Sequence, residues 1–320
     1  MSSMPFFTHN SPPLHGLFIP LSYTFHMRCD LHVHTTASGM CNTPGLTGIC
    51  LESYNQPEDV YHRCKQRGMS IVTVTDHDSI AAAEVLRKYP DFFLSEEVTV
   101  RMPTGTEMHL GVYGISEKDH TEIQRRRNDF IALLMYLTER KLFFSVNHVF
   151  SGLTGHREEE DFNWFASYVP AFEIRNGQMW AEANQSAERL ARKLGKIGVG
   201  GSDSHTLRGV ALTFTEVPGA RTVPEYFTAL RAGRGIAQGE HGNYGKLTLD
   251  VWSFVGSALK ANPLAAAILP LTVLVPVITA CHWLNEVRFC KKWTPRLMGG
   301  THRSRRLWDV DSQFEANWAR

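Results

Sequence analysis

Short apolar runs alternate with longer amphipathic segments between residues 27 and 245. A run of about four to eight apolar residues is typical of a buried strand. Such runs predict strands at Arg28–His34, Ile71–Thr75, Glu107–Tyr113, Leu142–Asn147, Ala171–Arg175 and Lys196–Gly200. Helical spacing and stop signals predict helices at Pro57–Arg67, Ile80–Lys88, Thr121–Arg140 and Ala181–Leu194. Strands that alternate with helices favour an α/β fold of parallel βα units, near the size of a (β/α) barrel.

The N-terminal arm, residues 1–26, does not share this pattern. It is rich in Pro, Ser and aromatic residues and lacks the basic start and apolar run of a secretory signal. We therefore expect it to be disordered. Met1 and Met27 both fit as the start of translation, because Met27 directly precedes the first predicted strand.

The C-terminal segment, residues 246–320, is predicted to be a helical, apolar appendage. Residues 261–285 contain no Asp, Glu, Lys or Arg, and a bilayer-spanning helix needs about 20 apolar residues. The basic residues that follow are typical of a cytoplasmic flank. Pro263, Pro270 and Pro276 instead favour two short buried helices that close a soluble domain. A cytoplasmic protein and one with membrane contact through 261–285 both fit.

The composition narrows the classes of function. Of 320 residues, 43% are hydrophobic, which excludes a chain that is disordered as a whole. Lys and Arg number 33 against 32 Asp and Glu, so nucleic acid is a less favoured partner. The six cysteines form no CxxC pair, which argues against a structural zinc ribbon. The histidine count of 15 is high, and the positions of these residues indicate the chemistry.

Histidines and carboxylates gather at the ends of the predicted strands. His32 and His34 lie two residues apart, so they share one face of a strand and can bind one metal ion. Further polar groups are Asp76-His77-Asp78, Glu96-Glu97, His109, Asn147-His148 and Asp203-Ser204-His205. Taken singly, His109 fits a buried core histidine, Asp78 a helix N-cap, and Glu96-Glu97 a solvated acidic pair.

Taken together, these groups predict a metal centre. Burial of so many polar side chains without a partner would cost several kcal/mol for each, and cations supply that partner. Imidazole and carboxylate ligands without thiolate suit Zn²⁺, Mn²⁺ or Fe²⁺. More ligands are present than one tetrahedral ion needs, so we expect at least two ions.

At these residues the sequence resembles the PHP family, named for polymerase and histidinol phosphatase domains. The resemblance covers about residues 27–245, and all of the motifs occur in family order. It implies a metal-dependent hydrolase domain with a distorted, TIM-like (β/α)₇ barrel and two or three divalent ions. By this resemblance, one ion is held by His32, His34, Glu97 and Asp203. Glu97 bridges to a second ion, which is held by His109 and His148, and a third is held by His77 and His205.

The sequence departs from the family pattern at the third ion. Members with three ions usually offer a His or Asp a few residues after the His-x-His pair, but Gly39 and Met40 occupy those positions here. The third ion is then absent, weakly held, or supplied with a ligand by Cys41. Without it, His77 and His205 would act on the substrate directly.

The resemblance implies a phosphoesterase, which hydrolyses a phosphate ester of a small metabolite or nucleotide with a metal-activated water. We expect Asp203, His205 and His77 to be catalytic, with His205 or His77 protonating the leaving oxygen. Arg175, with Asn176, is the candidate phosphate ligand, since arginine binds phosphate through two hydrogen bonds. Arg157 and Arg208 are weaker candidates, and Arg125-Arg126-Arg127 fits a solvated helix face.

Two other functions remain open at this point. One is a 3′–5′ exonuclease-type phosphodiesterase that acts on nucleic-acid ends, which should show a basic path with aromatic platforms. The other is a non-catalytic scaffold domain stabilised by its metals. A membrane tail would favour a phosphorylated lipid or glycan as the substrate.

Overall fold

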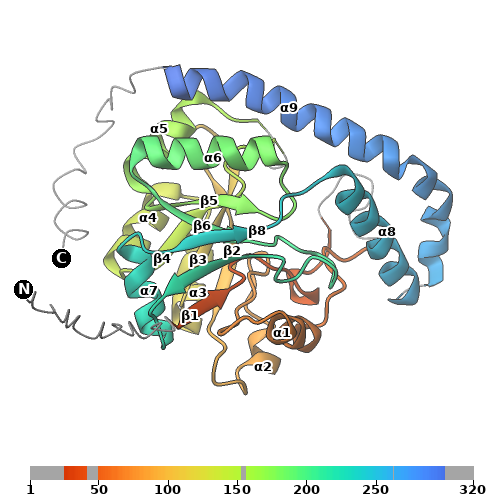
Figure 1. Cartoon of the computed structure of the whole chain (residues 1–320), viewed down its shortest axis with the longest axis horizontal. Coiled ribbons are helices and arrows are strands. Elements are labelled where there is room, and N and C mark those ends of the chain that lie inside the picture. The colour runs from red at the N-terminus through yellow and green to blue at the C-terminus, as the bar shows by residue number, and fades with distance from the viewer. Residues whose placement is uncertain (1–24, 42–49, 153–155, 262, 300–320) are drawn as a thin grey trace, which may run out of the picture.

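The computed structural model of the chain describes residues 25–41, 50–152, 156–261 and 263–299. Its strands form two sheets with helices around them (Figure 1). One sheet has five strands in the order β2-β3-β4-β5-β6, and the other has three in the order β1-β7-β8. The α/β class predicted from the sequence is confirmed.

The strands are β1 (His26–Cys29), β2 (Ser95–Arg101), β3 (Glu107–Tyr113), β4 (Phe143–Val146), β5 (Ala171–Asn176), β6 (Ile197–Gly201), β7 (Thr213–Pro218) and β8 (Ile236–Gly239). The α-helices are α1 (Pro57–Gln66), α2 (Ala83–Leu86), α3 (Glu117–Arg126), α4 (Phe130–Glu139), α5 (Glu159–Tyr168), α6 (Ala181–Leu194), α7 (Val223–Arg231), α8 (Tyr244–Ala261) and α9 (Val275–Gly299). Two 3₁₀ helices are η1 (Thr36–Ser38) and η2 (Pro263–Leu274).

The expectation of parallel pairing holds only for β4, β5 and β6. The β2–β3, β3–β4, β1–β7 and β7–β8 pairs are antiparallel. A short turn joins β2 to β3, in which Met102 N donates to Thr106 O at 2.8 Å. Gly105 has a φ of 83° in this turn, a left-handed conformation that glycine adopts without strain. A connection this short can join only antiparallel strands.

Two of the predicted strands, Arg28–His34 and Ile71–Thr75, do not form regular ladders beyond residue 29. Side-chain oxygens replace backbone partners in and just after the first of these segments. Val33 N donates to Thr75 Oγ1 at 3.0 Å, and Thr35 N donates to the Asp76 carboxylate at 2.6 Å. Single parallel bridges at Val33–Ser204 and His77–Glu97 connect the segments to their neighbours. Among the described residues the strands thus form no continuous closed barrel.

The predicted helix Thr121–Arg140 is divided into α3 and α4. Asp129 lies between them in an extended conformation, with φ −128° and ψ 95°. Its carboxylate accepts a hydrogen bond from Ala132 N at 3.0 Å and thereby begins α4. Aspartate favours an N-cap over a helix interior because its side chain competes for backbone N–H groups.

The C-terminal half of α9 packs into the α/β body and so is not a separate appendage. Cys290, Trp293 and Leu297 of α9 are buried in the main hydrophobic core. The Trp293 ring lies 4.9 Å from that of Phe162, measured between centroids. Lys193 Nζ, at the end of α6, donates to Leu297 O at 2.6 Å. The described helices include none with the length and apolar character needed to span a membrane.

Candidate metal centre

The eight side chains predicted to be metal ligands gather in one cluster, with the Glu97 carboxylate, on β2, at its centre. Glu97 is 1% exposed. Its oxygens lie close to the ring nitrogens of His32 (3.2 Å), His34 (3.4 Å), His77 (3.4 Å), His109 (3.4 Å) and His148 (3.3 Å). One carboxylate thus faces five imidazoles.

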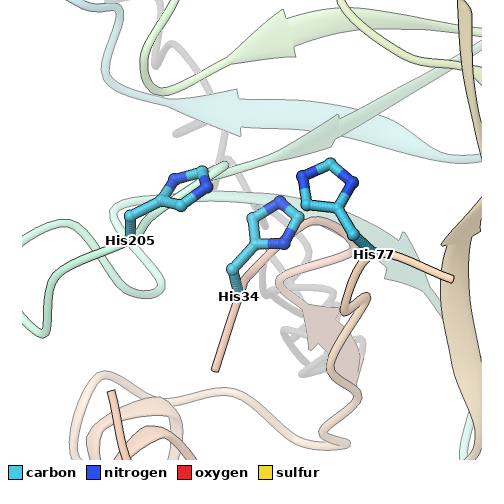
Figure 2. Close-up of side chains that lie close together, drawn as sticks. All are labelled: His34, His77 and His205. Atoms are coloured by element: carbon cyan, nitrogen blue, oxygen red, sulfur yellow. The ribbon is translucent and has the colours of Figure 1, made fainter. Parts of the chain in front are cut away.

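Asp203 and His205 complete this cluster. Asp203 Oδ1 lies 3.4 Å from His32 Nε2 and 3.3 Å from His34 Nε2. The His34 ring stacks between those of His77 and His205, with centroid separations of 4.6 and 4.4 Å (Figure 2). Four triads could each hold an ion, because their ligand atoms lie within 4.8 Å of one another: His34-His77-His205, His32-His148-Asp203, His32-His34-Glu97 and His77-Glu97-His109.

The backbone is strained where it presents two of these ligands. His148, after β4, has a φ of 32°, and Asp203, after β6, has a φ of 50°. Non-glycine residues rarely adopt such left-handed values, and they concentrate at functional sites. Gly201, at the end of β6, lets this strand approach the segment that carries His32, since a Cβ at Gly201 would lie 2.3 Å from the His32 Cβ. Asp203 N donates to His32 O at 2.6 Å, which fixes this approach.

A second set of side chains contacts the predicted ligands. Glu173 lies 2.9 Å from His32 Nδ1 and accepts a hydrogen bond from His148 N at 2.8 Å. Asn176 Nδ2, predicted to bind substrate, donates to both Glu173 and Asp203, at 2.9 and 3.0 Å. Asn147 Nδ2 donates to Glu97 at 2.8 Å. These contacts fix the orientation of the side chains in the cluster, as hydrogen-bond partners of metal ligands do.

Our sequence interpretation did not include Glu173. The sequence does carry a signal for it, because Glu173 follows the apolar start of Ala171–Asn176. A carboxylate in a buried strand needs a partner. It also missed Glu52, whose Oε1 lies 3.4 Å from His205 Nε2. Ser53 Oγ donates to both His34 O and His205 O at 3.2 Å and so holds this segment against the cluster. No sequence pattern marks Glu52, since it lies in a connection without regular spacing.

Burial and neighbouring charges set the protonation of the cluster. Burial lowers the pKa of His34 to about 3 and also lowers that of His77, so both rings are neutral and can donate a lone pair. Burial alone would raise the pKa of Glu97, but the imidazoles of His32, His109 and His77 outweigh it and hold that pKa well below its usual range. Burial alone would lower the pKa of His205, but the Glu52 and Asp203 carboxylates raise it.

The candidate phosphate-binding arginines contact other groups. Arg175 donates to Gly239 O at 2.9 Å, Arg157 is buried and donates to Glu107 O, and Arg208 Nε lies 3.4 Å from Asp250. Arg175 as a phosphate ligand stays a prediction. Arg125-Arg126-Arg127 was expected to form a solvated helix face. Arg125 and Arg126 pair with Glu122, whereas Arg127 pairs with Asp78, next to His77.

The positions that the family pattern uses for the third ion hold no ligand. Gly39 ends η1 with a φ of 78°, and the Met40 side chain is 46% exposed. Cys41 is buried, and its N–H donates to Cys50 O at 2.9 Å. The carboxylate found beside His205 is instead that of Glu52.

Comparison with known proteins agrees with the motifs. Residues 181–234, which include Asp203 and His205, match the PHP-associated family model. The fold resembles the crystal structure of a two-domain protein from Bacteroides vulgatus that contains a predicted PHP-like metal-dependent phosphoesterase. The two share 15% identity at a TM-score of 0.52, over 79% of this chain and 75% of that chain. The matched model and the shared fold support a PHP domain.

The fold also resembles the crystal structure of PsfC from Pseudomonas syringae. The identity is 15% and the TM-score 0.50, over 75% of this chain and 99% of that chain. At these identities the two likenesses show a shared fold. No curated protein matches the sequence.

Proposed function

We propose that this protein is a metal-dependent phosphoesterase that hydrolyses a phosphate ester of a small metabolite or nucleotide. The observation that carries the proposal is the Glu97 carboxylate, which lies within 3.4 Å of five imidazoles. Such a group of lone pairs and negative charge is what multivalent cations require.

The residues fit two divalent cations. The buried Nδ1 atom of His109, which faces Glu97, makes no hydrogen bond, and a buried unpaired polar atom is costly unless another group pairs with it. His32, His34, Glu97 and Asp203 would hold one ion, and Glu97, His109 and His148 the other. Zn²⁺, Mn²⁺ and Fe²⁺ suit these ligands. The chemistry that bound cations supply in such sites is activation of a water and neutralisation of phosphoryl charge.

The side chains at the edge of the cluster would contact the substrate. The side chains of His77 and His205 are 20% and 28% exposed, whereas His32 and His34 are buried. The Glu52 and Asp203 carboxylates raise the pKa of His205, which favours a proton on its ring. His205 would therefore donate the proton that the leaving oxygen needs, and His77 would contact the phosphoryl group.

The Glu52–His205 pair leads to a test of this role. Glu52→Gln should lower the turnover of an alkyl phosphate about 10- to 100-fold, because His205 would lose the carboxylate that keeps it protonated. Turnover of p-nitrophenyl phosphate, whose leaving group needs no proton, should change little. Glu58→Gln, at an exposed residue paired with Lys88, is the matched control. A loss of one equivalent of metal in Glu52→Gln would instead assign Glu52 to a third ion with His77 and His205.

The function itself is tested by metal analysis of the purified protein beside a panel of phosphoesters. The panel should include sugar phosphates, mononucleotides, 3′,5′-bisphosphates and short oligonucleotides. We expect monoester hydrolysis that a chelator abolishes and that Mn²⁺ or Zn²⁺ restores. Hydrolysis confined to oligonucleotides would favour the nuclease. Bound metal with no hydrolysis, and a lower melting temperature after chelation, would favour the scaffold.

The distorted (β/α)₇ barrel implied by the resemblance belongs to the same proposal. The bridges Val33–Ser204 and His77–Glu97 support it, because they join both irregular segments to the ends of the five-stranded sheet. Such an arrangement would bring all of the strand ends that carry predicted ligands to the same end of the barrel.

A further inference from the structure

An exposed apolar surface lies where η2 meets α9. Its side chains are Leu269, Val273, Leu274, Val277 and Ile278, here called the apolar tip. Val273 is 75% exposed, Ile278 60% and Val277 59%. Single exposed apolar residues are common on soluble proteins, but a contiguous group of them indicates an interaction surface.

The apolar tip is held in place by α8. Trp252 Nε1 donates to Thr272 O at 3.4 Å, and Tyr244 Oη donates to Pro276 O at 3.1 Å. Figure 1 shows α8 and the first turns of α9 on the side of the molecule away from α4 and α7, beyond the labelled strands. The apolar tip is therefore a formed, projecting surface.

A basic row continues from the apolar tip along the outer side of α9. Its exposed members are Arg288, Lys291, Lys292 and Arg296. In the described part of the chain, none of these four lies in an ion pair with a carboxylate. The opposite side of α9 carries Cys290, Trp293 and Leu297, which are buried in the main core. The helix thus presents one face to the protein and a face that is first apolar and then cationic to the outside.

We propose that this outer face binds the surface of an anionic lipid bilayer. The apolar tip would enter the boundary between headgroups and acyl chains, and the basic row would contact the anionic headgroups. This combination is typical of helices that lie in the interface.

Charge selects the bilayer over a second copy of the chain. Two copies that met through this face would bring together two sets of four cations that have no carboxylate partner, which is unfavourable. An anionic membrane surface is complementary to the same four charges and accepts the apolar tip as well. The inference is independent of the proposed hydrolase activity.

The test is flotation of the full chain with vesicles of phosphatidylcholine, with or without phosphatidylglycerol. We expect binding to the anionic vesicles that weakens in high salt, and weaker binding to neutral ones. The double variant Val277→Asp/Ile278→Asp should lower the partition coefficient about tenfold or more, because aspartate enters the apolar region unfavourably. Arg288→Glu/Lys292→Glu should abolish the preference for anionic lipid.

The matched control is Ile131→Asp/Met135→Asp, at two exposed apolar residues of α4. It should bind like the unmodified protein, and unchanged circular dichroism and metal content of all variants would show intact folding. Absence of binding to anionic vesicles would overturn the proposal, as would equal loss in the control. A lipid-free dimer in light scattering that Val277→Asp/Ile278→Asp dissociates would overturn it too, and would assign the face to a second copy.

Discussion

Asp203→Ala is expected to remove bound metal and to lower phosphoesterase turnover by more than about 100-fold. Loss of an outer partner of a metal ligand usually costs about 10- to 100-fold, and Asp203 faces both His32 and His34 directly. Its removal also leaves two close imidazoles without the charge that favours a cation between them. Metal content by plasma emission and steady-state kinetics on the best ester of the panel measure the two effects.

The control for this variant is Asp59→Ala, at an exposed residue in the first turn of α1. It should keep full metal content and turnover. If Asp203→Ala retained both, Asp203 would not be a ligand and the proposed centre would lose its link between β6 and the His-x-His pair. Circular dichroism separates loss of metal from loss of the fold.

Trp293→Ala is expected to lower the free energy of unfolding by about 3–5 kcal/mol, the usual cost of truncating a buried aromatic side chain to alanine. Trp293 is 3% exposed and packs against Phe162 and Phe289. Because it lies on α9, the effect would show that the C-terminal helix contributes to the stability of the α/β body. Urea unfolding followed by circular dichroism measures the change.

Trp283→Ala is the matched control on the same helix, because its side chain is 41% exposed. It should cost about 1 kcal/mol or less. Equal effects of the two substitutions would contradict the packing described for α9. Truncation after Gly245 would remove Cys290, Trp293 and Leu297 from the core, so a loss of solubility after truncation would not report on membrane contact.

The convergence of these side chains could be predicted from the sequence because its signals are local. His32 and His34 share a strand face, and His148 and Asp203 directly follow apolar strands. Each of these residues contacts the cluster around Glu97. The α/β class and the bounds of β3 and α6 follow from local periodicity in the same way.

What the sequence did not predict depends on contacts between distant segments. Glu52 meets His205 only after the chain folds. The segment after β1 reads as a strand by composition, but side-chain oxygens of Thr75 and Asp76 accept from its backbone N–H groups at Val33 and Thr35. The apolar run 261–285 resembled a membrane span, because sequence alone does not show that α9, which begins within this run, continues into the core.

One buried carboxyl on α9 links that helix to the metal centre. Glu286 accepts hydrogen bonds from Ser151 Oγ and Gly152 N, both at 3.1 Å, and Ser151 N in turn donates to His148 O at 3.0 Å. The loop that carries a predicted ligand is thus anchored on the helix that carries the lipid-facing surface. By thermodynamic reciprocity, a cation that bound more tightly with α9 docked would stabilise the docked position of α9 by the same factor.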